Sequence, residues 1–467
     1  MTVSSPAAAL GNRLDGLPLS SFHRRLVIAL AGMILFDWVE TYSFAFVIPT
    51  LRDQWGLSLS TVALIAGVGQ LGAFVGGVLG GYLADRIGRR RTLLASAALY
   101  CTAAVCCVLV QNEWQLLVAR TAAHFGSQGM AVVAIVVLAE FVPAASRGRM
   151  QTYKVAVGSL GIPIAAWAGF FFVPQWTWGW RLVFALGLFS LVFAWLIRRW
   201  VPESPRWLAS RGELEKADAI VRSIERQCGI QTPPDSGPAV TGPAAPAPDR
   251  PRFGELWKGQ NRRNFLVVTT MWVAGLLAYS AYNTWTPTLL SENGLDLDLR
   301  DTLLLSAFLA TAAPFGALAS VPLIDRWDRR RTQLALGSLG GATLLMFAFV
   351  REPLAVLVLG CLVNLLFHMA MPFLQVYSAE IFPTRIRALG SGSANALSRI
   401  FNFGAPLLVA TIYTSAGYTA VFVLLAALSA AGGLVAVLFG ARTTGVSLEA
   451  TTTTPDRPLT RKEPTAP

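Results

Sequence analysis

Twelve apolar segments dominate this 467-residue chain, and each is long enough to cross a lipid bilayer. A hydrocarbon core of about 30 Å requires about 20 helical residues at a rise of about 1.5 Å each. We therefore expect an all-α membrane protein with twelve transmembrane helices. The expected spans cover residues 26–49, 61–83, 92–110, 115–141, 153–173, 181–200, 264–290, 302–324, 332–350, 354–380, 388–413 and 418–440.

Charge and cysteine usage exclude several other classes of protein. Only 14% of the residues are charged, whereas soluble domains carry roughly 25%. The net charge of +12 arises from short basic clusters between apolar segments, which favours anionic lipid head groups over nucleic acid. The five cysteines contain no C-x-x-C pair, and no nucleotide loop, catalytic triad or metal spacing occurs. We expect a monomer that is not an enzyme and that holds no cofactor or metal.

The basic residues also predict how the chain is oriented. Loops on one side of the expected bundle carry most of them, and the opposite loops are nearly bare. Cytoplasmic loops are enriched in Lys and Arg, so both termini are expected in the cytoplasm, in a cell (inner or plasma) membrane. The first apolar run follows a polar leader and has no small-residue cleavage site, which is typical of a span and not of a signal peptide.

An internal repeat divides the chain into two halves. The run D-R-x-x-R-R-R occurs at residues 85–91 and again at 325–331, an offset of 325 − 85 = 240. Glu140 and Glu380, each within A-E-x-x-P, keep the same offset, since 380 − 140 = 240. Two motifs at one offset predict two parallel six-helix bundles, with a substrate cavity between them.

The repeat and the composition together predict five parts. They are a cytoplasmic leader (1–25), a first six-helix half (26–200), a cytoplasmic linker (201–262), a second six-helix half (263–440) and a disordered cytoplasmic tail (441–467). Within the linker we expect a short amphipathic helix from Glu213 to Arg226 and an extended Pro-rich segment from Pro233 to Pro251.

Two motifs carry a resemblance to a known family. Residues 81–90, G-Y-L-A-D-R-I-G-R-R, resemble the signature that follows the second span of the major facilitator superfamily. Residues 202–208, P-E-S-P-R-W-L, are similar to the motif after the sixth span of its sugar-porter and organic-ion branches. The resemblance covers the whole membrane domain and implies the major facilitator fold and transport by alternating access.

Charged residues at the expected cytoplasmic helix ends predict a gate. A carboxylate such as Asp85, facing arginines of a neighbouring helix, can form a charge cluster that holds an inner gate closed and opens when it breaks. Positive-inside bias alone explains solvated arginines such as Arg90 and Arg91, but it does not require acids. The predicted gating residues are Asp85, Arg86, Gly88, Arg89, Glu140, Arg147, Glu203, Arg206, Asp325, Arg329, Glu380 and Arg387.

The first span contains two acids near the bilayer midplane, Asp37 and Glu40. A charge at this depth is costly, so we expect these residues to exchange a proton, with a polar helix contact as the alternative. Arg120, His124 and Gln128 follow in the fourth span at i, i+4 and i+8 and share a helix face.

Arg120 is expected to approach Asp37 and to couple its proton to the substrate; snorkelling to the outer surface is the alternative. Proton-linked sugar porters are similar in having a first-span Asp and a fourth-span Arg. Glycines are usual there at the positions of His124 and Gln128.

Arg399, in the eleventh span, is a permanent charge near the midplane without an evident acidic partner in neighbouring spans. A substrate carboxylate could bind it in bidentate geometry; capping of carbonyl groups or pairing with Glu40 is the alternative. Organic-anion carriers and bacterial niacin and metabolite proton symporters are similar in carrying an arginine here. The further candidates for substrate binding, which could equally join helices, are Tyr282, Asn283, Trp285, Asn364, His368 and Gln375.

Together these features predict a secondary active transporter that symports a small organic anion, such as an aromatic or heterocyclic carboxylate, with protons across the bilayer. A proton-driven exporter of drugs or metabolites and a sugar:proton symporter are the alternatives within transport. A sensor built on a carrier fold is an alternative from another class, disfavoured by the short tail.

Overall fold

The computed structural model describes residues 6–143, 146–230, 253–292, 297–324, 326–383 and 386–442. These residues form helices and connecting loops, and they contain no strand. The first part of the chain contains α1 (Pro6–Asp15), α2 (Ser21–Trp55), α3 (Leu59–Ile87), α4 (Arg89–Leu109), α5 (Glu113–Phe141), α6 (Arg147–Ser159), α7 (Gly161–Phe172), α8 (Gly179–Ala185), η2 (Leu186–Phe189), α9 (Ser190–Trp200), α10 (Pro205–Ser210) and α11 (Leu214–Gln227). The second contains η3 (Phe253–Trp257), α12 (Gly259–Glu292), α13 (Leu299–Ser320), α14 (Arg329–Phe349), α15 (Pro353–Glu380) and α16 (Arg387–Phe439).

The expected membrane spans correspond to helices of the structure. Eleven helical stretches of the described chain are long and apolar enough to cross a membrane, with α6–α7 and α8–α9 each forming one stretch. The last stretch lies in α16, which is interrupted at Gly417, where φ is +79° and ψ is −175°. Such angles are not helical and suit glycine. The described chain therefore contains twelve crossing segments, as the apolar pattern predicts.

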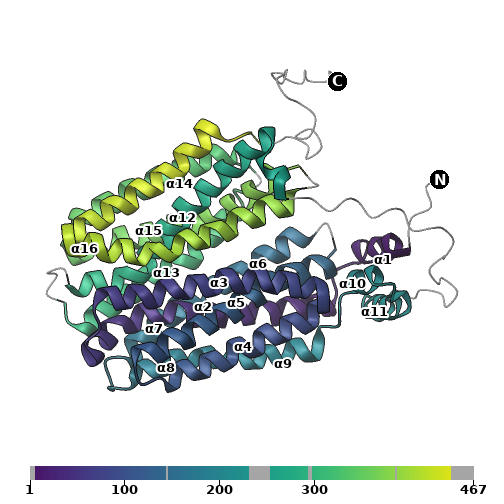
Figure 1. The fold of residues 1–467 in the computed structure, drawn as a ribbon, viewed down its shortest axis with the longest axis horizontal. Helices are drawn as coiled ribbons and strands as arrows, with labels where there is room; N and C mark the ends of the chain where they lie inside the picture. The colour runs from purple at the N-terminus through teal and green to yellow at the C-terminus, as the bar shows by residue number, and fades with distance from the viewer. Residues whose placement is uncertain are drawn as a thin grey trace.

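The two halves lie side by side with their helices along the long axis of the molecule (Figure 1). Helices α2 to α9 form the first half, purple to blue, and α12 to α16 form the second, green to yellow. Contacts between the halves join α2 to α12, α3 to α16, and α7 to α13.

The offset of 240 recurs in the structure itself. Helix α4 begins at Arg89 and α14 at Arg329, which is 329 − 89 = 240. Arg89 pairs with Glu140 at 3.1 Å, and Arg329 pairs with Glu380 at 3.2 Å. Equivalent helices thus carry equivalent ion pairs, which confirms the predicted repeat.

The glycine-rich part of α3 brings its backbone close to α5. A methyl group at Gly76 would overlap the carbonyl oxygen of Phe125, and one at Gly80 would lie 2.6 Å from Cα of Gly129. These glycines therefore allow close packing of α3 against α5.

Three short helices form a layer at one end of the bundle. Helices α1, α10 and α11 lie together there, at the right of Figure 1. The linker helix expected at Glu213–Arg226 appears as α11, and the part of the chain expected as a leader contains α1. The Pro-rich segment, from Pro233 to Pro251, and the tail from residue 443 lie outside the described residues.

Ion pairs hold this layer together. Arg13 of α1 donates to Asp218 at 2.6 Å and to Glu225 at 2.7 Å on α11. The hydrogen bond to Glu225 raises the pKa of Arg13 above its usual value. Leu10 and Leu14 of α1 are buried, so apolar packing accompanies the ion pairs.

Candidate binding cavity between the halves

A cavity of about 240 Å³ lies between the halves, lined by α2, α3, α5 and α6 on one side and by α12, α13, α15 and α16 on the other. Ligand pockets generally measure roughly 300–1,000 Å³, so this one suits a small solute. Its lining contains an acid, two arginines, two histidines and several amides.

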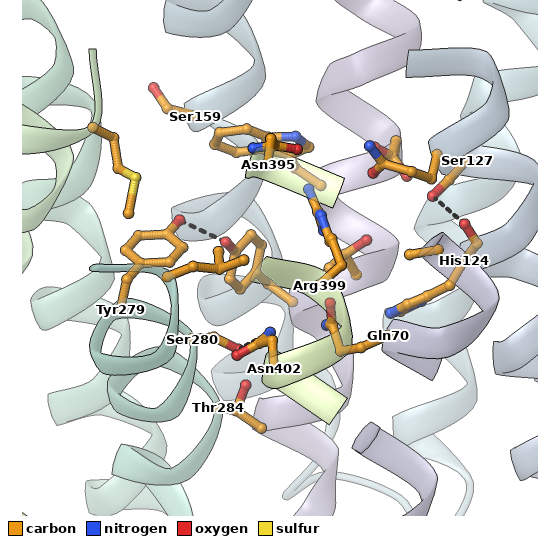
Figure 2. Close-up of a pocket in the computed structure, with 18 of the residues that line it drawn as sticks. Gln70, His124, Ser127, Ser159, Tyr279, Ser280, Thr284, Asn395, Arg399 and Asn402 are labelled. Atoms are coloured by element: carbon orange, nitrogen blue, oxygen red, sulfur yellow. Dashed lines mark hydrogen bonds between the residues drawn. The ribbon is translucent and has the colours of Figure 1, made fainter. Parts of the chain in front are cut away.

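Arg399 of α16 projects into the middle of this cavity (Figure 2). Tyr279 lies on one side of it, and His124 and Ser127 lie on the other. Its Nε is buried without a hydrogen-bond acceptor, and no described carboxylate lies within ion-pairing distance of it. The alternative of a pair with Glu40 is excluded, because Glu40 binds another arginine.

Asp37 of α2 also lines the cavity and is only 7% exposed. Its Oδ1 is buried without a hydrogen-bond partner among the described residues. Its charge interacts with that of Arg399 at a distance beyond ion pairing. The cavity therefore contains an acid and an arginine that face the same space without direct contact.

Glu40, one helical turn beyond Asp37, lies in a different environment. It is fully buried, does not line the cavity, and accepts a hydrogen bond from Nη1 of Arg120 at 3.0 Å. Arg120 also donates to the carbonyl oxygen of Thr41 at 3.2 Å and lies 4.6 Å from the ring centroid of Phe44.

These contacts correct two expectations about Arg120. It is 3% exposed, so it does not snorkel to a surface. Its partner is Glu40 and not Asp37, because α5 crosses α2 at the level of Glu40. The rings of Phe44 on α2 and Phe184 on α8 lie beside the guanidinium group of Arg120.

The polar face expected on α5 lines the cavity as its spacing implied. Arg120, His124 and Gln128 are all part of the lining. Ser127, which the sequence analysis missed, joins them and donates to the carbonyl oxygen of His124 at 3.3 Å. Nδ1 of His124 is buried without a hydrogen-bond partner among the described residues.

A chain of hydrogen bonds crosses the cavity from one half to the other. The hydroxyl groups of Tyr42 and Tyr279 are 2.5 Å apart, and that of Tyr279 is 3.2 Å from Nε2 of His368. Nδ1 of His368 is 2.8 Å from the carbonyl oxygen of Asn364, which can only accept, so Nδ1 donates. In a neutral imidazole Nε2 then accepts from Tyr279, which accepts from Tyr42.

Four predicted substrate-binding residues lie outside the cavity lining. Tyr282 donates to the carbonyl oxygen of Gly360 at 3.0 Å, and Trp285 is 1% exposed in the apolar core. Asn283 donates to a carbonyl group of its own helix at 2.9 Å, and Asn364 supports His368 from behind. His368 and Gln375 do line the cavity.

The lining contains further polar residues that the sequence analysis did not single out. They include Gln70, Ser159, Ser280, Thr284, Asn395 and Asn402. Asn395 and Asn402 lie four residues before and three residues after Arg399, on the same face of α16. Their helical spacing was the signal that could have identified them.

Predicted gating residues of the first half form a network at the end of the bundle that carries residues 85–91. Arg89 pairs with Asp85 at 2.9 Å and with Glu140 at 3.1 Å. Glu203 accepts from the backbone N–H of Arg89 at 2.8 Å. Gly88 has φ +109°, and a side chain there would collide with Glu203.

The remaining gating residues connect to other elements. Arg147 and Arg206 both pair with Asp15 of α1 at 2.9 Å, a partner that the sequence analysis did not foresee. Arg86 donates to the hydroxyl group of Tyr82 at 3.0 Å, and Arg387 begins α16. Asp325 lies outside the described residues. The ion pairs of Arg89 with Glu140 and of Arg329 with Glu380 each join helices within one half.

Comparison with known proteins finds relatives that match most of the chain. A family model described as sugar (and other) transporter matches residues 28–454. A putative metabolite transport protein of Bacillus subtilis is 32% identical over 438 residues, covering 94% of this chain and 96% of that protein. The niacin transporter of Acinetobacter baylyi is 29% identical over 443 residues, covering 94% and 99%. A gallate transporter of Pseudomonas putida is 24% identical over 380 residues, covering 81% and 82%.

Among solved structures, the xylose transporter of E. coli in a partially occluded inward open conformation is similar, with a TM-score of 0.74. The sequence identity is 18%, and the match covers 92% of this chain and 100% of that chain. At this identity the likeness concerns the fold.

Proposed function

The chain belongs to the sugar (and other) transporter family of the major facilitator superfamily, and we propose that it symports a small organic anion with protons by alternating access. Membership makes it a multi-pass membrane transporter and not an enzyme. The identity of the cargo and the coupling to protons are the subject of the proposal.

The observation that carries the proposal is the unpaired charge of Arg399 in the cavity. A guanidinium group in a low-dielectric space is costly unless an anion compensates it. A carboxylate matches its planar donors in bidentate geometry, which a neutral solute cannot do as strongly. The substrate carboxylate therefore binds Arg399.

Charge balance supports coupling to a proton at Asp37. With Asp37 ionised and no substrate, the charges of Asp37 and Arg399 sum to zero. With Asp37 protonated and a carboxylate bound, the sum is again zero. States that carry only the proton or only the anion leave a net charge in the cavity, which disfavours the movement of the halves. Transport is then electroneutral, with one proton per monovalent anion.

The lining and the relatives support an aromatic or heterocyclic acid. Trp38, Tyr42, Trp272 and Tyr279 line the cavity and offer flat apolar faces beside the charged groups. The names of two relatives specify niacin and gallate, both of which are carboxylates on an aromatic ring.

Alternating access gives the other predicted residues a role. We infer that the end carrying residues 85–91 faces the cytoplasm, with both termini there, and that Arg89, Glu140 and their counterparts Arg329 and Glu380 act in the gate. Glu40 and Arg120 act as a fixed structural pair, and the transporter acts as a monomer.

A sugar is the second candidate, favoured by the amides in the lining, which are Gln70, Gln128, Gln375, Asn395 and Asn402. Amide groups are suited to hydroxyl-rich solutes. An organic-anion transporter requires a carboxylate on its substrate, and a sugar transporter does not. Binding of an acid but not of the corresponding amide would therefore distinguish the two functions.

The test uses purified protein with nicotinate, benzoate, nicotinamide and xylose. We expect the two carboxylates to raise the melting temperature and nicotinamide and xylose to leave it unchanged. Proteoliposomes with an inward proton gradient should then accumulate the stabilising acid, and a protonophore should abolish accumulation. Stabilisation by xylose alone would replace the proposal with sugar transport, and efflux-only activity would replace it with export.

A further inference from the structure

A second cavity, of about 640 Å³, lies away from the transport pathway. It is lined by the start of α2, the start of α4, the end of α9 and one face of α11. These elements all belong to the first half and to its linker, so the cavity is not shared between the halves.

Four arginines surround this cavity, one from α2 (Arg25), one from α4 (Arg90) and two from α9 (Arg198 and Arg199). None of the four forms an ion pair with a carboxylate of the described chain. Like charges that converge in this way repel one another, so an anion between them is favourable.

Glu203 is the acid among the lining residues, but its carboxylate is already engaged. Its Oε1 accepts from the backbone N–H groups of Arg89 at 2.8 Å and of Arg90 at 3.0 Å. This carboxylate therefore compensates the helix start of α4. The guanidinium groups remain uncompensated.

The guanidinium group of Arg90 is fixed in position and has one N–H donor, Nε, without an acceptor in the described chain. One Nη donates to the carbonyl oxygen of Arg198 at 2.7 Å, which links α4 to α9. Its Nε is buried and has no hydrogen-bond partner in the described chain. A buried donor of this kind is costly unless a ligand supplies an acceptor.

The position of the cavity specifies where the anion comes from. Ile28 lies three residues after Arg25 on α2 and is 55% exposed, and Trp195 lies three residues before Arg198 on α9 and is 62% exposed. In a membrane transporter such exposed apolar side chains face lipid tails. Arg25 and Arg198 therefore lie one helical turn away, at the level of the phosphate groups.

We propose that this cavity binds the phosphate head group of an anionic phospholipid. The arginines of α2, α4 and α9 contact the phosphate oxygens, the acyl chains lie along Ile28 and Trp195, and α11 covers the head group from the aqueous side. The bound lipid thereby fastens α11 and the start of α4, which also carries Arg89 of the gate network.

The test titrates delipidated full-length protein in an uncharged detergent with phosphatidylglycerol and follows its melting temperature. We expect saturable stabilisation by phosphatidylglycerol, and none by phosphatidylcholine, inorganic phosphate or glycerol 3-phosphate. The triple variant R25Q/R198Q/R199Q should bind about 100-fold more weakly, because each arginine near an anionic lipid surface contributes roughly a factor of five. It leaves Arg90 and the gate network intact.

The matched control is R24Q/R149Q/R331Q, which removes three exposed arginines that do not line the cavity. It should respond to phosphatidylglycerol as the natural protein does. A full response in the first variant, or an equal loss in both variants, would overturn the proposal. Equal stabilisation by inorganic phosphate would assign the site to a free anion and overturn the lipid.

A second measurement covers the case in which the triple variant melts too early to be titrated. Native mass spectrometry of the single variant Arg199→Gln reports the fraction of protein that retains one lipid. We expect that fraction to fall about fivefold relative to Arg24→Gln at the same lipid concentration. Equal retention in the two single variants would contradict the proposed site.

Discussion

Asp37 and Glu40 are acids about one turn apart on the same helix, yet their surroundings in the folded protein differ. Glu40 is fully buried and paired with Arg120 at 3.0 Å, and the rings of Phe44 and Phe184 lie beside the guanidinium group of Arg120. Asp37 faces the cavity, lacks a partner for Oδ1, and interacts with Arg399 only at a distance. A compensated pair such as Glu40 and Arg120 stabilises the fold, while Asp37 and Arg399, which lack direct contact, are available to a proton and a substrate.

The largest effect is expected from breaking the ion pair between Glu40 and Arg120. Glu40→Gln leaves Arg120 as an uncompensated buried charge and should lower the free energy of unfolding by about 3–5 kcal/mol. Denaturant unfolding in detergent measures it. The double variant Glu40→Gln/Arg120→Gln should recover much of the loss, because no charge is then left alone.

Asp37→Asn is the matched control for that prediction, since it removes an acid that has no ion pair. It should change the free energy of unfolding by less than about 1 kcal/mol. If Asp37→Asn destabilised the protein more than Glu40→Gln, the distinction between the two acids would be wrong.

Arg399→Ala should abolish most transport without preventing folding. Two charge-assisted hydrogen bonds to a carboxylate contribute about 1.5–3 kcal/mol each, so kcat/KM for the acid should fall about 100-fold or more. Initial rates in proteoliposomes measure this change. Arg399→Lys retains the charge but not the bidentate geometry, and about a tenfold loss is expected. Undiminished uptake in Arg399→Ala would refute the role of Arg399.

Asp37→Asn should uncouple transport of the acid from the proton gradient. In the natural protein, each pH unit of gradient should support about tenfold accumulation of a monovalent anion, because one proton accompanies each substrate. The variant cannot carry that proton, and its empty cavity keeps the uncompensated charge of Arg399, so it should exchange the acid across the bilayer without accumulating it. Counterflow without a gradient should persist and serves as the control. Accumulation that still followed the pH gradient would assign the proton to another residue.

The smallest effect is expected from the hydroxyl chain. Tyr42→Phe removes one hydrogen bond that joins the halves within the cavity lining. If the lost bond of about 1 kcal/mol holds the cavity in its substrate-binding arrangement, the substrate KM should change roughly fivefold. Tyr282→Phe removes a hydroxyl group that donates to Gly360 outside the cavity, with a similar stability cost and no effect on KM. Melting and uptake measured side by side compare them. Equal KM values in the two variants would show that the chain does not act on the substrate.

The helices and the repeat could be predicted because both depend on local sequence. Span length follows from apolar run length, and the offset of 240 reappears in the starts of α4 and α14. Helical spacing likewise indicated the shared face of Arg120, His124 and Gln128, all of which line the cavity.

Spacing could not decide which face of α12 meets the cavity. Helix α12 is surrounded by other helices, so all its faces are apolar with scattered polar groups. Tyr279 and Tyr282 are three residues apart, and the sequence pattern does not show which of them faces the cavity. In the structure, Tyr279 contacts Tyr42 and His368, whereas Tyr282 packs in the core beside Phe347. An amphipathic pattern indicates orientation only when one face meets water.

The twelve crossing segments, the two halves and the charged residues deep within them can all be read from the sequence, because hydrophobic length and motif offset are properties of the chain. The pairing of Arg120 with Glu40, which leaves Asp37 and Arg399 open to the cavity, depends on how the helices pack in the folded protein. Both acids are within one turn of each other on α2. The choice between them depends on where α5 crosses α2, and that crossing is set by packing between helices distant in sequence.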